Sequence, residues 1–296
     1  MRKLLALAAV ALAAAVAPDA AADVPWVDRP LTLPPLHVSA DAGIGFGLFE
    51  GYRLDPGGSG NVTATGSQAG WGANLEAAVG LPFIGELGLR FGYRFGPDIT
   101  LPGTAVEPSG TMERAGAAAG TGLGADHFAR LFDPIVTEPG QDDFTNPELR
   151  VRNTLLDLKV LELGLETRVI LPTATGSDLA VTPALPVRVH VPGLLRVDTG
   201  VFVPVVFDSV TSFAVDIPAQ AFFQVHDAFV GPLTGIRFVR PGGDAPSYTE
   251  IPLGIGAGYT LGGIIDLKVQ VRTERVNDPA WWEYFGAGVG VGLRVP

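Results

Sequence analysis

The sequence predicts an all-β fold, a membrane-spanning antiparallel up-and-down β-barrel of about twelve strands. Apolar and polar residues alternate with a period of two along most of the chain, while helical three-four spacing is nearly absent. The alternating runs extend over about ten residues, the length of a tilted strand that crosses a bilayer, whereas soluble strands usually run over about five or six. Tight turns and long polar loops also follow one another in alternation, as in barrels that cross a membrane.

Composition excludes several classes of site. The chain of 296 residues has no cysteine, which removes disulfide scaffolds, thiolate metal sites and cysteine nucleophiles, and its four histidines are scattered. The formal net charge of −11 argues against nucleic acid as a partner, because phosphate binding needs clustered Lys and Arg. We therefore expect neither a metal nor a cofactor.

The first 22 residues have the pattern of a cleaved signal peptide. Arg2 and Lys3 precede an apolar run over 4–16 and small residues at 20–22. That run is shorter than the roughly 20 residues that a transmembrane helix needs. Residues 23–36, which are rich in proline, are then expected to form an extended periplasmic lead-in to a barrel over 37–296.

Unbroken alternation predicts the first three strands at 37–49, 71–81 and 86–96. The clearest case is 264–275, where the odd positions from 265 to 271 are apolar and the even positions from 266 to 274 are polar or charged. A strand face with this many charges needs water or carboxylates opposite it. We therefore expect the polar faces to line the barrel lumen and the apolar faces to meet lipid.

Two longer stretches are predicted to be hairpins. In 146–171 the apolar residues change from even to odd positions, which indicates either a turn near 157–160 or a β-bulge. We favour the turn, since it places the tight turn at 192–193 on the periplasmic side, and the same parity makes 214–239 a hairpin that turns near His226 and Asp227. Ten strands is the alternative count. The twelve strands are predicted at 37–49, 71–81, 86–96, 146–156, 161–171, 179–190, 194–207, 214–225, 229–239, 248–260, 264–275 and 282–295.

The longest connection, 97–145, is strongly acidic and rich in Gly, Ala and Pro. We expect a soluble external loop. Binding of divalent cations, a constriction of the lumen and contact with a partner are the alternatives, although the spacing of its carboxylates matches no EF-hand. Aromatic residues near predicted strand ends are expected to form interfacial girdles, namely Trp71, Phe95, Phe207, Tyr259, Trp281 and Trp282.

The signal peptide, the glycine-rich alternating strands and the last strand together resemble Gram-negative outer-membrane β-barrel proteins. In that last strand, Gly286, Gly288, Gly290 and Gly292 alternate with apolar residues. The resemblance covers residues 33–296 and implies an outer-membrane location, with membrane lipid and the barrel-assembly machinery as partners. Such barrels typically end in an aromatic residue that this machinery reads, whereas this chain ends with Pro296.

The resemblance is to an architecture that serves pores, enzymes and anchors alike. The leading hypothesis is a porin-like channel for small polar solutes, or a structural envelope protein, with no enzymatic activity. The charged side chains on the inner face would either line a narrow pore or fill a closed lumen with ion pairs. The candidates are Glu76, Glu86, Arg90, Arg94, Arg150, Arg152, Glu162, Glu166, Arg168, Arg188, Asp266, Lys268, Arg272 and Glu274.

Two other functions are kept as alternatives. His37, Ser39 and Asp41 share one strand face, and outer-membrane phospholipases likewise place His and Ser two residues apart, which suggests a lipid hydrolase. However, same-face neighbours on a strand lie roughly 7 Å apart, beyond a direct hydrogen bond. The second alternative is an exported soluble β-sandwich that binds a partner.

Overall fold

The computed structural model describes residues 24–54, 62–83, 85–95, 147–173, 179–207, 211–240, 247–273, 275–279 and 281–295. The expected signal peptide at 1–22 and the acidic loop at 97–145 lie outside these residues. The described strands are β1 (Val38–Leu54), β2 (Val62–Leu81), β3 (Gly85–Phe95), β4 (Glu148–Leu158), β5 (Leu161–Ile170), β6 (Leu179–Val191), β7 (Leu195–Phe202), β8 (Val205–Phe207), β9 (Ser212–Val225), β10 (Ala228–Arg240), β11 (Tyr248–Glu250), β12 (Leu253–Leu261), β13 (Ile265–Thr273) and β14 (Phe285–Val295).

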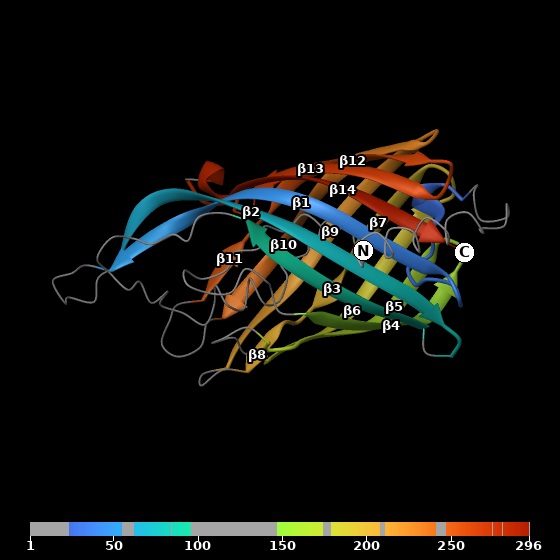
Figure 1. Ribbon diagram of the computed structural model, residues 1–296, viewed down its shortest axis with the longest axis horizontal. Coiled ribbons are helices and arrows are strands. Elements are labelled where there is room, and N and C mark those ends of the chain that lie inside the picture. The colour runs from blue at the N-terminus through green and yellow to red at the C-terminus, as the bar shows by residue number, and fades with distance from the viewer. Residues whose placement is uncertain are drawn as a thin grey trace, which may run out of the picture.

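These segments form one closed antiparallel barrel (Figure 1). β7 and β8 both lie between β6 and β9, while β11 and β12 both pair with β10, so each pair is one barrel strand. The breaks fall at Pro204 and Pro252, which have no backbone N–H to donate to a neighbouring strand. The first strand pairs with the last along Val38–Gly47, which closes a barrel of twelve strands. The twelve-strand prediction is confirmed, and the ten-strand count and the soluble sandwich are wrong.

The hairpins fall where the parity of the sequence predicted them. β4 ends at Leu158 and β5 begins at Leu161, and β9 and β10 are joined through His226 and Asp227. His226 and Gly193 lie at tight turns with positive φ, the backbone conformation that such turns demand. Short turns join β2 to β3, β4 to β5, β6 to β7, β9 to β10 and β12 to β13, and because the strands are antiparallel all five lie at one end of the barrel, which is called here the short-turn end.

The first two strands are longer than the alternation predicted. β1 continues to Leu54 and β2 begins at Val62, rather than at 49 and 71. β14 pairs with β1 only along Val38–Gly47, and β3 pairs with β2 only along Trp71–Leu81, so the rest of this hairpin extends past its neighbours as a two-stranded ribbon (Figure 1). Residues 62–70 are mostly Gly, Ser, Thr, Gln and Ala and carry no apolar alternation, which is why the pattern missed them.

The outer surface of the barrel is apolar. Leu75, Ile255 and Val289 are each more than half exposed, and they belong to a large set of exposed Leu, Ile, Val and Phe side chains on alternating strand positions. A soluble monomer rarely exposes an apolar surface of this extent, so this belt fits contact with lipid. Of the girdle aromatics, Phe207, Tyr259, Trp281 and Trp282 are exposed, whereas the side chains of Trp71 and Phe95 are outside the described part.

Helical structure is confined to short 3-10 segments in the part of the chain described, η2 (Trp26–Asp28) and η3 (Trp281–Tyr284). Neither these nor any other helix within the described ranges has the length and apolar character needed to cross a membrane.

Candidate functional site

The side chains expected to line the lumen lie on the inner face and are almost completely buried. Glu166, Arg150 and Arg152 are each at most 1% exposed. The side chains of Arg94 and Glu274 are outside the described part of the structure. Glu148, Arg196 and Asp198, which share the same strand faces, are buried as well. The buried candidates are Glu76, Glu86, Arg90, Arg150, Arg152, Glu162, Glu166, Arg168, Arg188, Asp266, Lys268 and Arg272.

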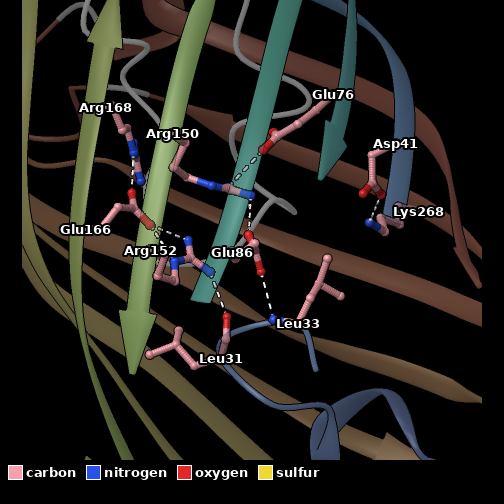
Figure 2. A network of polar contacts seen from close by, with 10 residues as sticks. All are labelled: Leu31, Leu33, Asp41, Glu76, Glu86, Arg150, Arg152, Glu166, Arg168 and Lys268. Carbon is pink, nitrogen blue, oxygen red and sulfur yellow. Dashed lines mark hydrogen bonds and ion pairs between the residues drawn. The ribbon is translucent and has the colours of Figure 1, made fainter. Parts of the chain in front are cut away.

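Many of these groups pair with one another across neighbouring strands. The Arg150 guanidinium lies between Glu76 and Glu86, with N–O distances of 2.8 and 2.5 Å (Figure 2). Glu166 accepts from both Arg152, at 2.5 Å, and Arg168. Such groups can be buried because each charge is compensated locally. In this part of the lumen, the charged side chains are buried in ion pairs rather than exposed to water.

Further pairs extend the network around the barrel. Asp198 accepts from Arg188 at 2.6 Å and from Arg196 at 2.7 Å. On the opposite wall, the Lys268 ammonium donates to Asp41 at 2.6 Å. This last pair lies over Gly292, where a Cβ would come within 2.4 Å of the Asp41 carboxylate. The inward glycines of β14 thus leave room for charged side chains of adjacent strands.

The N-terminal segment, residues 24–36, packs against the inner face of the barrel through its middle part, whereas Val24 and Leu36 at its two ends are exposed. The pattern of four prolines suggested an extended lead-in outside it, but Trp26, Val27 and Leu31 are each at most 2% exposed. Arg29 is also buried and pairs with Asp266 on β13, which lies 237 positions away in sequence. This segment is called the plug below.

Charged side chains of the wall bind the backbone of the plug. The Leu31 N–H donates to Glu162 at 2.7 Å, and the Leu31 carbonyl accepts from Arg152 at 2.7 Å. The Leu33 N–H donates to Glu86 at 2.9 Å (Figure 2). These three wall residues belong to β5, β4 and β3. Glu86 and Arg152 therefore serve both the ion-pair network and the plug.

The same contacts continue toward the start of the plug. The Arg29 carbonyl accepts from Arg188 at 2.8 Å, the Trp26 carbonyl accepts from Arg196 at 3.2 Å, and the Val27 N–H donates to Gln224 at 3.3 Å. The prolines of the plug have no N–H, so they add no buried donor that would need a partner. The backbone N–H and carbonyl groups named here therefore have hydrogen-bond partners in the lumen, although the plug is not a strand of the sheet.

Aromatic packing fixes the first residues of the plug. The Trp26 ring stacks on Phe229 with centroids 4.1 Å apart and meets Phe222 edge-on at 5.0 Å. The Arg196 guanidinium lies 4.0 Å from the centroid of the same ring. Phe229 and Leu233, which disturb the apolar alternation of β10, face inward and are buried in this cluster. Apolar side chains on a lumen face are the sequence signal that could have revealed the plug.

The plug is anchored at the short-turn end of the barrel. The Asp28 carboxylate accepts from the Gly193 N–H at 2.8 and 2.9 Å, in the turn between β6 and β7. At the other end of the plug, the Leu36 N–H donates to the Gly80 carbonyl at 2.8 Å.

Replacing Gly80 by alanine is expected to dislodge the last part of the plug. A Cβ at this position would lie 1.9 Å from the Pro34 carbonyl oxygen and 2.7 Å from that of Leu33, and backbone atoms cannot yield by a rotamer change. Limited chymotrypsin digestion of the folded barrel should cleave within the plug at least tenfold faster than in wild type. Gly286→Ala is the matched control, since its Cβ would meet no atom closer than 3.4 Å. Equal cleavage of both variants would contradict the packing described.

The hydrolase candidates are not assembled into a catalytic arrangement. Asp41 is paired with Lys268, and no hydrogen bond joins the side chains of His37, Ser39 and Asp41 in the described structure. Ser39 is 2% exposed and faces the interior. Partial burial, together with the positive charge of Arg294, lowers the pKa of the His37 imidazole. Within the described ranges, no group of three or more His, Asp or Glu side chains is arranged to hold a metal ion.

Comparisons with known proteins identify the fold. No known family matches the sequence, and no curated protein matches it. An outer membrane channel from Pseudomonas putida F1 has a TM-score of 0.58 at 10% identity, over 91% of this chain and 98% of that one. The NanC porin (TM-score 0.48, 5% identity, 86% and 99% covered) and the KdgM porin (0.46, 9%, 85% and 98%) are more distant. The resemblance to Gram-negative outer-membrane barrels is confirmed, and the chain has an outer-membrane β-barrel fold.

Proposed function

We propose that the protein is an outer-membrane channel for small polar solutes, closed at rest by its own N-terminal plug. The exposed apolar belt supports a membrane location, because it matches the lipid-facing surface of a spanning barrel. The observation that carries the proposal is the polar seat of the plug, in which the backbone of residues 26–33 is bound by charged side chains of the wall.

A binding surface made of polar wall side chains suits a plug that moves out of the lumen. When the segment moves out, water can replace each hydrogen bond, so the net cost is about 0.5–1.5 kcal/mol per ordinary bond rather than the full strength of the interaction. An apolar plug over its whole length would instead expose its entire contact surface to water. The wall charges would then line a wet passage, in which oppositely charged groups such as Arg150 and Glu76 face the solute.

Conductance of the refolded mature chain in a planar bilayer tests this function. Correct folding is checked first by heat-modifiable migration on a gel. We expect wild type to show brief stepwise openings, and Arg29→Ala to raise the open fraction at least tenfold, because loss of a charged hydrogen bond costs about 1.5–3 kcal/mol. Arg29 holds Asp266 and the Gly263 carbonyl, whereas Arg240 is exposed at the opposite rim, so Arg240→Ala is the matched control.

A folded barrel without stepwise conductance in either wild type or Arg29→Ala would contradict the proposal. It would identify a permanently filled structural barrel instead.

A further inference from the structure

The plug is held largely through its backbone, as a bound peptide would be. Wall carboxylates accept from the N–H groups of Leu31 and Leu33, and wall guanidinium groups donate to the carbonyls of Arg29 and Leu31. Donors and acceptors thus alternate along the segment in the way that recognises an extended chain independently of its sequence. Each of these four bonds comes from a side chain of the wall rather than from the edge of a strand.

Three side chains of the plug occupy separate pockets of the wall. The Trp26 ring lies against Phe229, Phe222 and Arg196. The Arg29 guanidinium donates to Asp266 and to the Gly263 carbonyl.

The third pocket, formed with Ala184 and Phe202, holds Leu31. These pockets select an aromatic residue, a basic residue three positions later, and a leucine two positions after that.

We propose that this end of the lumen is a binding site for extended oligopeptides, with the plug as its resident occupant. The proposal rests on the proposed function and names the solute class of that channel. A free peptide with the same spacing of aromatic, basic and leucine residues, presented from the short-turn end, takes the site when the plug vacates it. The wall supplies the charges for its backbone and the pockets for its side chains.

A tethered occupant competes strongly, because a short linker gives it an effective concentration in the millimolar range. The test therefore uses the full chain with a weakened plug, Trp26→Ala/Leu31→Ala, which loses two pocket contacts and keeps the wall intact. The probe is a synthetic peptide with the sequence of residues 25–34, PWVDRPLTLP, labelled with a fluorophore at its C-terminus. Binding is measured by fluorescence anisotropy in detergent micelles.

The decisive comparison is with the same peptide N-methylated at the amides that correspond to Leu31 and Leu33. This change removes both N–H donors to Glu162 and Glu86 and keeps every side chain. We expect the unmodified peptide to bind the weakened chain at least tenfold more tightly than the methylated one, and at least tenfold more tightly than it binds wild type. Equal binding of the two peptides, or no binding to a variant that retains heat-modifiable folding, would overturn the proposal.

The outcome is separable from that of the conductance test. A variant that conducts and binds no peptide contradicts the peptide site alone. A variant that binds the peptide and never conducts supports the site and contradicts the channel.

Discussion

Alanine at Trp26 is expected to raise the open fraction of the channel about a hundredfold. The ring is 1% exposed and stacks on Phe229, with the Arg196 guanidinium on it as well. Truncation of a buried tryptophan costs about 3–5 kcal/mol, and each 1.4 kcal/mol is a factor of ten in an equilibrium constant. Because this ring fixes the beginning of the plug, most of the cost falls on the closed state. Single-channel recording of the open fraction measures it.

The matched control is Trp281→Ala. Trp281 is 45% exposed, and η3, to which it belongs, lies at the end of the barrel opposite the short turns. Its loss should leave the open fraction within twofold of wild type. If Trp26→Ala gave the same open fraction as this control, the aromatic cluster would have no part in closing the barrel.

Glu166→Ala is expected to lower the free energy of unfolding by about 3–5 kcal/mol. This carboxylate is fully buried and compensates both Arg152 and Arg168. Removing one partner from a buried ion pair leaves an uncompensated charge, which is costly in this range. Urea unfolding of the barrel in lipid vesicles, followed by tryptophan fluorescence, gives the change.

The control for this stability experiment is Asp157→Ala, at an exposed position beside a tight turn. Its effect should stay within about 0.5 kcal/mol, as for surface substitutions in general. Equal unfolding midpoints for the two variants would mean that the lumen ion pairs contribute nothing measurable.

Much of the barrel could be predicted from local pattern. Strands that alternate strictly, such as 264–275, fix which residues face inward, because a shift by one position would move every charge into lipid. The hairpins near 157–160 and at His226 followed from the same parity. The extra length of β1 and β2 could not be predicted, since residues 62–70 are mostly small or polar and carry no apolar alternation that would mark them as a strand.

The site could be predicted only in part. The inward charges were readable from the sequence, but their partners were not, because closure of the barrel brings together residues as distant as Arg29 and Asp266. The plug was missed since its prolines resemble those of a solvated linker. Its buried apolar residues could be recognised only from their contact with the inward Phe222 and Phe229, which lie about two hundred positions later in the chain.

The most direct test of the central claim, that the plug closes the channel, is a reversible disulfide between the plug and the wall. The Thr32 and Thr154 hydroxyl oxygens lie 3.0 Å apart, and the chain has no native cysteine, so Thr32→Cys/Thr154→Cys creates a single possible bridge. One bilayer recording before and after addition of dithiothreitol compares both states in the same molecules. The account predicts no openings while the bridge is intact and wild-type openings after reduction. Openings of wild-type frequency with the bridge intact would contradict it.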